Sequence, residues 1–160
     1  MASIDTHIVG LVSDTHGLVR GAVHDALAGV ELILHAGDVG GQEILDELSL
    51  IAPVRAVFGN TDPTDLPGLE EEILLTVGGI RVHVSHGHEV GTPTPAKLAE
   101  RYDADVLVYG HTHRQLVTRI GGRLVINPGA AGPRRFNLLP SVGRLIISGR
   151  KAEVEIVELT

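Results

Sequence analysis

The stretch HIVGLVSDTHG at residues 7–17 begins with an apolar run of strand length and ends in residues typical of a turn. The same arrangement recurs in ELILHAGD at 31–38 and in PVRAVFGNTD at 53–62. Between these stretches, apolar residues recur at helical spacing, around 23–27 and over 42–51. This β-α-β-α-β order predicts a parallel sheet with right-handed crossovers.

The rest of the chain has the marks of hairpins and of one further helix and strand. Apolar segments flank Gly78-Gly79 and Gly121-Gly122, and a glycine pair between two strands is typical of a tight hairpin. We expect a helix at 95–102 and strands at 73–77, 80–85, 105–109, 116–120, 123–127, 143–148 and 153–159. No repeat, low-complexity tract or interior linker interrupts the pattern, so we expect a single domain over residues 1–160.

Composition and charge narrow the class of protein. Apolar residues make up 43% of the chain, with only 2 Phe, 2 Tyr and no Trp, so aliphatic side chains must fill the core. The 13 basic and 20 acidic residues give a net charge of -7, which argues against general binding to duplex nucleic acid. The lack of Cys excludes disulfides and thiolate chemistry. Without a signal segment or an apolar run near the roughly 18 residues of a membrane span, we expect a cytoplasmic protein with no membrane contact.

Polar side chains that can bind metal ions follow five of the expected strands. They are Asp14, His16, Asp38, Asn60, His86, His111 and His113. Each alone has a simpler explanation, because Asp is common at helix N-caps and Asn is common in turns. However, the carboxyl ends of strands in open α/β sheets lie along one edge, where ligands bind. Seven such residues at one edge are hard to explain as caps and turns, so we interpret them as a metal site.

The residue types indicate which ions would bind. Asp, Asn and His donors without sulfur favour Mn²⁺, with Fe, Zn, Co or Ni as alternatives, over Ca²⁺ or Mg²⁺. Side chains two residues apart in an extended segment point the same way, so His111 and His113 are expected to reach one centre or two adjacent ones. Seven ligands exceed one tetrahedral site and fit two ions that share a carboxylate. Asp38, alone at the end of the second strand, is the candidate shared ligand.

The order of these motifs resembles the signature of the calcineurin-like metallophosphoesterase superfamily. The five matching blocks are DTH at 14–16, GD at 37–38, GNTD at 59–62, HG at 86–87 and GHTH at 110–113. The segment NPG at 127–129 and Arg134 are similar to the small bacterial and archaeal phosphodiesterase branch of that superfamily. Five blocks in order are a much more specific signal than a single glycine motif.

The resemblance implies an α/β fold, a four-layer αββα sandwich of two mixed β-sheets flanked by helices, with two divalent metal ions. One ion would take Asp14, His16, Asp38 and His113, and the other would take Asp38, Asn60, His86 and His111. A hydroxide that bridges the two ions would attack the phosphorus, with Asn60 also in contact with the substrate. Four positive charges against two carboxylates would attract a phosphate ester to an acidic protein.

Two positions depart from the family pattern. Many members carry a His after the Asn of the third block, where it protonates the leaving group, but this chain has Thr61. The candidates to replace it are His88, as a proton shuttle, and a metal-bound water, and the alternative role of His88 is to support the metal ligands. The branch also carries a Ser where this chain has Ala130. Arg134 or Arg135 is then the expected substrate contact, and the alternative is a solvated basic pair.

Two further histidines have simpler expected roles. His35 lies in an apolar run and is expected to be buried and hydrogen-bonded, in support of the loop that carries Asp38. On a continuous strand, His86 and His88 would share one face and His83 would lie on the other. We therefore expect His83 in the core or at the surface rather than at a metal ion.

These observations favour a metal-dependent phosphodiesterase with a phosphate ester as its partner. A phosphomonoesterase of the same mechanism is an alternative, because two metal ions can act on either ester. Another alternative is a scaffold, because the retromer complex contains an interaction subunit of this fold that lacks part of the histidine set. This chain retains the whole set. The hairpin edges are open to pairing in a homo-oligomer, although no sequence feature requires one.

Overall fold

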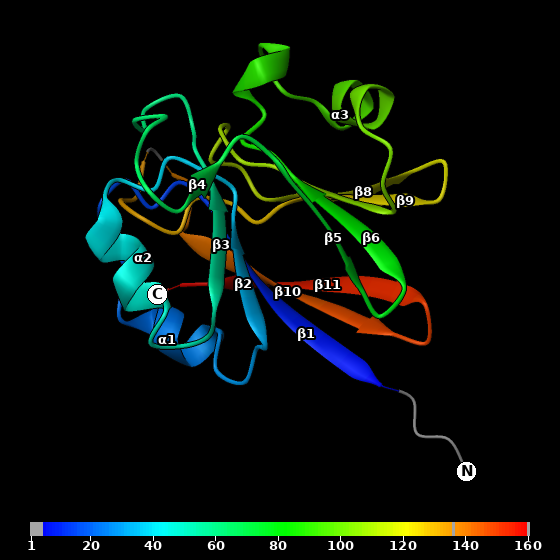
Figure 1. Cartoon of the computed structure of the whole chain (residues 1–160), viewed down its shortest axis with the longest axis horizontal. Coiled ribbons are helices and arrows are strands. Elements are labelled where there is room, and N and C mark those ends of the chain that lie inside the picture. The colour runs from blue at the N-terminus through cyan, green and yellow to red at the C-terminus, as the bar shows by residue number, and fades with distance from the viewer. Residues whose placement is uncertain (1–4, 136, 160) are drawn as a thin grey trace.

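The computed structural model describes residues 5–135 and 137–159, which form two β-sheets packed face to face (Figure 1). The larger sheet has the strand order β11-β10-β1-β2-β3-β4. Its strands are β1 (Thr6–Val12), β2 (Leu32–His35), β3 (Val54–Val57), β4 (Leu69–Glu70), β10 (Ser141–Ser148) and β11 (Lys151–Glu158). Strands β1, β2 and β3 pair in parallel, which confirms the fold predicted from the β-α-β-α-β order.

The smaller sheet has the strand order β5-β6-β7-β9-β8. Its strands are β5 (Ile73–Val77), β6 (Ile80–Val84), β7 (Val106–Val108), β8 (Leu116–Ile120) and β9 (Arg123–Asn127). The two predicted glycine-pair hairpins are β5–β6 and β8–β9, and both pair antiparallel. Strands β6, β7 and β9 are parallel, so this sheet is mixed as well.

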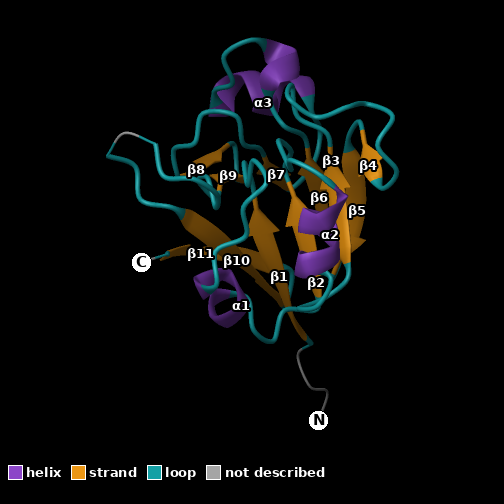
Figure 2. Cartoon of the chain, turned by 90° about the vertical axis from the view of Figure 1, so that its left-hand side faces the viewer, coloured by secondary structure: helices purple, strands orange, loops and turns teal. Residues whose placement is uncertain are grey.

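Helices cover the outer face of each sheet and complete an αββα sandwich (Figure 2). The helices are α1 (Ala22–Ala26), α2 (Gln42–Leu48) and α3 (Pro95–Arg101), and a 3₁₀ helix, η1, covers His88–Val90. Alternation along β1 shows how the layers form, because Val9 and Leu11 face the smaller sheet while Ile8 and Val12 face α1 and α2. Helix α3 packs on the other side of the smaller sheet, with Leu98 against Leu107.

The differences from the expected elements come from tertiary pairing. The two-residue strand β4 was not expected, and it forms because it pairs with β3. Strand β10 begins at Ser141 rather than at residue 143, because β11 pairs with it back to that residue. Strand β6 ends at Val84, so the expectation that His86 and His88 share a strand face was wrong. None of the helices in the described part of the chain is long and apolar enough to span a bilayer.

Candidate metal centre

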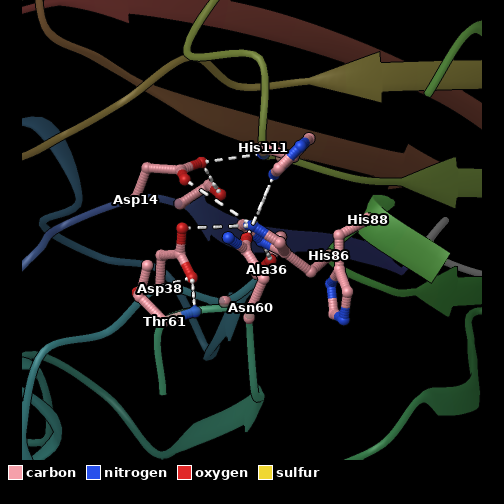
Figure 3. A network of polar contacts seen from close by, with 12 residues as sticks. Asp14, Ala36, Asp38, Asn60, Thr61, His86, His88 and His111 are labelled. Atoms are coloured by element: carbon pink, nitrogen blue, oxygen red, sulfur yellow. Dashed lines mark hydrogen bonds and ion pairs between the residues drawn. The ribbon is translucent and has the colours of Figure 1, made fainter. Parts of the chain in front are cut away.

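Five loops meet at one end of the two sheets and bring the seven predicted ligands together. Figure 3 shows five of them, Asp14, Asp38, Asn60, His86 and His111. The loops follow β1, β2 and β3 of the larger sheet and β6 and β7 of the smaller one. All five are at the carboxyl ends of parallel strands, which is why residues far apart in the sequence become neighbours. The structure thus places the candidate centre between the two sheets.

The first cluster consists of Asp14, His16 and His113. Oδ1 of Asp14 lies 3.7 Å from Nε2 of His16 and 3.4 Å from Nε2 of His113. The two Nε2 atoms are 3.4 Å apart. The other oxygen of Asp14 accepts hydrogen bonds from the Ser13 hydroxyl and from the backbone N–H of His111, which leaves Oδ1 to face the histidines.

The second cluster consists of Asp38, His86 and His111. Oδ2 of Asp38 is 3.3 Å from Nε2 of His86, which is 3.3 Å from Nδ1 of His111. Oδ1 of Asn60 lies 3.1 Å from the same His111 nitrogen, so the amide joins this group of atoms.

Asp38 lies between the two clusters. Its Oδ2 atom is 3.6 Å from Nε2 of His16, in addition to its contact with His86. Its Oδ1 atom accepts two hydrogen bonds from Thr61, at 3.0 Å from the backbone N–H and at 2.8 Å from the hydroxyl. Oδ2 is therefore the oxygen that both clusters can share. This role of Thr61 was not predicted from the sequence, where the residue stands out only because it lacks the acidity of a histidine, and no local pattern shows it.

The backbone at these residues is unusual. Positive φ angles occur at 53° for Asp14, 44° for His16, 56° for Asp38, 72° for His111 and 65° for His113. Among the other non-glycine residues of the described chain, only Arg150 has a positive φ angle. Such conformations cost on the order of 1–3 kcal/mol each and concentrate at functional sites. The expectation of an extended segment at residues 111–113 was wrong, and the two histidines point to different clusters.

Close backbone approach also limits the residue types that these loops accept. A Cβ atom on Gly59 would overlap Oδ1 of Asp38, so only glycine permits the third loop to approach the second so closely. Asp62 fastens the same two loops, because its carboxylate accepts hydrogen bonds from the backbone N–H groups of Val39, Gly40 and Gly59. Asp62 is thus a structural member of the GNTD block.

The tautomer of His86 follows from its hydrogen bond to the backbone. Its Nδ1 atom lies 2.7 Å from the carbonyl oxygen of Ala36, which can only accept a hydrogen bond. Nδ1 must therefore carry the proton, and the lone pair of Nε2 faces Asp38 and His111 in the neutral ring. This is the arrangement that orients a histidine ligand toward a metal ion.

Charges inside the site favour ionised carboxylates. Burial opposes ionisation of Asp14, but the contacts with His113 and His16 outweigh it and hold the pKa of this carboxyl well below its usual range. Burial also opposes ionisation of Asp38, but the contact with His86, whose Nε2 atom donates a hydrogen bond when the ring is protonated, and the hydrogen bonds from Thr61 lower its pKa to about 2. For His86, burial disfavours the charged ring, but the two carboxylates raise its pKa overall.

The residues fit divalent metal ions. Oδ1 of Asp14 is buried and accepts no hydrogen bond among the described residues, and a buried carboxylate oxygen needs a hydrogen-bond donor or a cation beside it. Ligand atoms that each lie about 2.1 Å from a tetrahedral ion are about 3.4 Å apart. The four separations between a carboxylate oxygen and an imidazole nitrogen of the same expected ligand set run from 3.3 to 3.7 Å. The separation of His86 from Asp14, which belong to different sets, is 3.9 Å. Both clusters thus have donors of suitable type and spacing for a cation.

The simpler explanations of the two aspartates do not hold. Helix α1 has Gly21 as its N-cap and α2 has Gly41, so neither Asp14 nor Asp38 caps a helix. The expectation for His35 is confirmed, because it is buried and hydrogen-bonded to Thr15 and to the backbone of Gly37.

The remaining predicted site residues lie around the clusters. The His88 ring centroid is 5.3 Å from that of His86 and 6.4 Å from that of His111, and the ring lies beyond His86 as seen from Asp38 (Figure 3). Arg134 is exposed, and the neighbouring Arg135 lines a pocket together with His111. His83 is buried, as one of the two expected outcomes, with Glu72 at 2.6 Å from its Nε2 atom.

A family model described as the calcineurin-like phosphoesterase superfamily domain matches residues 8–150. The chain belongs to the calcineurin-like phosphoesterase superfamily. A probable metallophosphoesterase of Methanothermobacter thermautotrophicus is 36% identical to it over 158 residues, which cover 94% of this chain and 91% of that protein. A phosphodiesterase of Methanocaldococcus jannaschii is 30% identical over 140 residues, which cover 76% of this chain and 82% of that protein.

A solved structure agrees with this placement. Vps29 of Entamoeba histolytica, in a crystal structure with Zn²⁺, superposes with a TM-score of 0.77 at 26% identity. The match covers 94% of this chain and 98% of that one. This calcineurin-like phosphoesterase thus has the fold of its superfamily and two candidate metal-binding clusters, as the sequence resemblance implied.

Proposed function

We propose that this protein is a metal-dependent phosphodiesterase that hydrolyses phosphate diesters at a dinuclear centre. The observation that carries the proposal is the position of Asp38, whose Oδ2 atom lies 3.6 Å from His16 of one cluster and 3.3 Å from His86 of the other. A carboxylate in that position suits two ions held close together. The phosphodiesterase among the relatives supports a diester as the substrate.

The donor atoms divide into two ligand sets. Asp14, His16, His113 and Asp38 would hold one ion, and Asp38, Asn60, His86 and His111 would hold the other. Nitrogen and oxygen donors without sulfur favour Mn²⁺, with Fe, Zn, Co and Ni as alternatives. When bound, such ions supply the Lewis acidity that activates water and neutralises a phosphate group.

Neighbouring residues hold the metal-ligand candidates in fixed orientations. The Ala36 carbonyl fixes the ring of His86, and Thr61 fixes Asp38 through its Oδ1 atom. The Thr61 hydroxyl donates its proton to that carboxylate, so it is not the group that protonates a leaving oxygen. Asn60 would contact the substrate as well as an ion, and Arg134 would contact the substrate from the rim.

His88 would supply the proton for the leaving group. It begins η1, two residues after His86, and its Nδ1 atom is buried without a hydrogen-bond partner among the described residues, 4.0 Å from Oε1 of Glu89. It lines a pocket with Phe58 and Tyr102, a place for the departing alcohol next to the second cluster. Proton donation from such a position typically contributes 10² to 10⁴-fold to the rate.

The test compares metal-free and Mn²⁺-loaded protein on bis(p-nitrophenyl) phosphate and on p-nitrophenyl phosphate. We expect no hydrolysis after chelation, recovery with Mn²⁺, two bound ions per chain, and preference for the diester. His113→Gln should abolish the recovery, whereas His24→Gln makes the same chemical change on the surface of α1 and should not.

Three other results of this test would contradict the proposed function. Preference for the monoester would indicate a phosphomonoesterase. Two bound ions with hydrolysis of neither ester would indicate a non-catalytic scaffold. Undiminished hydrolysis after exhaustive chelation would exclude metal dependence.

A further inference from the structure

A second pocket opens beside the candidate metal centre. It has a volume of about 200 Å³ and is lined by His111, Thr112, His113, Arg114, Arg135 and Leu138. Two of these residues belong to the metal clusters, one to each, so the pocket adjoins both. Its volume is several times the roughly 30 Å³ that one water molecule occupies in the liquid, which is enough for a polyatomic group.

Two arginines, Arg114 and Arg135, line this pocket. Among the described residues, neither Arg114 nor Arg135 has a carboxylate within ion-pairing distance, whereas Arg55 pairs with Glu70 and Arg81 pairs with Asp103. Most basic residues of the described chain lack a carboxylate partner, but many of them donate hydrogen bonds to backbone carbonyls, namely Arg20, Lys97, Arg119, Arg123 and Arg144. Within the part of the chain that the structure describes, the side chains of Arg114 and Arg135 make no such hydrogen bond, which leaves their guanidinium groups available to a ligand. A planar guanidinium matches the geometry of a phosphate or carboxylate group.

Both arginines extend from loops that are held in place beside the metal clusters. The backbone N–H of Arg114 donates to the Thr112 hydroxyl oxygen, which also accepts a hydrogen bond from the Asn127 amide. The loop that leads to Arg135 is joined to the first cluster, because the backbone N–H of Gly132 donates to the carbonyl of Asp14. A Cβ on Gly132 would overlap Thr15, so this close contact requires glycine.

The neighbouring pocket at His88 has the opposite character. Glu71, Glu72 and Glu89 line it together with Arg101, so its carboxylates would repel an anion. The two pockets therefore distinguish the two ends of a bound diester. The end that carries negative charge belongs on the side of His111 and His113, and the apolar wall of Leu138 suits the carbon chain that leads to it.

We propose that the pocket of Arg114 and Arg135 binds a second anionic group of the substrate, a phosphate or carboxylate carried by one of the alcohols of the diester. The assignment rests on the proposed function, and it names the substrate class as a phosphate diester with a further negative charge at a short distance from the phosphorus. The two arginines determine specificity and take no part in the bond-breaking step.

The test measures binding to Mn²⁺-loaded full-length protein by calorimetry. The ligands are an alkylphosphonate, which has no ester bond to hydrolyse, and the same compound with a terminal carboxylate or a terminal phosphonate. We expect the terminal anion to tighten binding by about tenfold, as one charge-assisted contact provides. The double variant Arg114→Gln/Arg135→Gln should lose this preference and keep the affinity for the simple alkylphosphonate.

A matched control makes the same charge change elsewhere. Arg150→Gln/Lys151→Gln alters the turn between β10 and β11, where both residues line a different pocket, and it should keep the native preference. Equal binding of all ligands by the native protein would overturn the assignment. Equal weakening of all ligands in the arginine variant would also overturn it, because the arginines would then contact the phosphoryl group at the metal centre.

Hydrolysis of bis(p-nitrophenyl) phosphate by the same sample separates this assignment from the proposed function. Hydrolysis without any preference for a terminal anion contradicts the pocket assignment alone. An arginine-dependent preference without hydrolysis contradicts the catalytic proposal and supports the anion pocket. Comparison of the carboxylate and phosphonate ligands then shows which anion the pocket prefers.

Discussion

At the scale of single residues, the two oxygens of Asp38 have different contacts, and this difference determines how the site is arranged. Thr61 donates two hydrogen bonds to Oδ1, so Oδ2 alone faces His16 and His86. A hydrogen bond to a charged group is worth about 1.5–3 kcal/mol, and partners that orient metal ligands change metal affinity by about 10 to 100-fold. The hydroxyl of Thr61 is therefore a positioning group for the shared carboxylate.

Replacement of Thr61 by Val should lower Mn²⁺ affinity by about tenfold or more, because the isosteric side chain removes the hydroxyl donor and keeps the backbone one. Thr61→Ser retains the hydroxyl and should bind Mn²⁺ like the native protein. Titration of free Mn²⁺ by electron paramagnetic resonance measures this without any assay of activity. Equal affinity in the Val and Ser variants would show that the hydroxyl has no such role.

The leaving group provides a second prediction at this scale. If His88 donates the proton, the rate should depend only weakly on the pKa of the departing alcohol, and His88→Gln should make that dependence steep. The logarithm of kcat for a series of aryl phosphodiesters, plotted against the pKa of the leaving alcohol, gives the slope. A steep slope in the native protein would mean that no general acid is present, as Thr61 alone would imply.

Residue types predicted much of this site, and contacts between distant residues supplied the rest. Loop Asp, Asn and His residues have few other uses in such numbers, so the ligand candidates were visible in the sequence. The roles of Thr61 and Asp62 could not be predicted from the sequence, because each depends on the close approach of two loops that are distant in the chain. Thr61 and Asp38, for example, are 23 positions apart.

At the scale of elements, His35 at the end of β2 ties the first two loops together. Its Nδ1 atom accepts from the backbone N–H of Gly37, so its Nε2–H donates to the hydroxyl oxygen of Thr15, whose own proton is donated to the carbonyl of Val39. Protonation of Nδ1 would break the contact with Gly37. Burial, against the attraction of nearby carboxylates, lowers the pKa of His35 to about 4.

This pKa predicts a loss of stability in acid. Between about pH 6.5 and pH 4 the unfolded chain binds a proton at His35 that the native state does not, so the free energy of unfolding should fall as the pH falls. The contribution of the neutral His35 ring to the free energy of unfolding is present in full above about pH 6.5, and it amounts to at most about 3 kcal/mol. Urea unfolding of chelated protein from pH 7 to pH 4 should show a flatter profile in His35→Gln.

The control for this measurement is His24→Gln, which replaces a half-buried histidine of α1 and should keep the native profile. Parallel profiles for the native protein and His35→Gln would mean that the pKa of His35 is the same in the native and unfolded states.

Strands were easier to predict than their ends. The hairpin at 116–120 and 123–127 was predicted to the residue, because apolar patterning and a glycine pair are local signals. The short strand β4 and the helix η1 were missed, since β4 exists only through its pairing with β3 and η1 follows a left-handed turn at Gly87. The apolar periodicity over 42–51 correctly predicted the start of α2, but the helix ends at Leu48, three residues earlier than expected.

At the scale of the whole molecule, the candidate centre joins the two sheets. The larger sheet supplies Asp14, His16, Asp38 and Asn60, and the smaller sheet supplies His86, His111 and His113. Each cluster draws ligands from both. Hydrophobic periodicity cannot show how two sheets face each other, because that packing is set by side chains such as Val9 and Val82 that meet only in the folded state. The prediction that two packed sheets share the metal ligands came from the family resemblance.

Ions held between the sheets should stabilise the whole fold. A ligand at 100 times its Kd adds about 2.7 kcal/mol of native stability, which for a chain of this size corresponds to roughly 5–10 °C in Tm. We expect Mn²⁺ to raise the Tm of the chelated native protein and of His24→Gln by that amount per tightly bound ion, measured by circular dichroism. Ca²⁺ should raise it less, because that ion prefers all-oxygen sites.

Asp38→Asn is the decisive variant, since it removes the charge shared by the two clusters and keeps the size of the side chain. Its Mn²⁺-induced shift should be smaller than that of His113→Gln, which alters one cluster only. The shift, rather than the Tm itself, is compared, because removal of a buried carboxylate changes the stability of the metal-free state as well. An unchanged shift in Asp38→Asn would mean that the stabilising ions bind outside the junction of the two sheets.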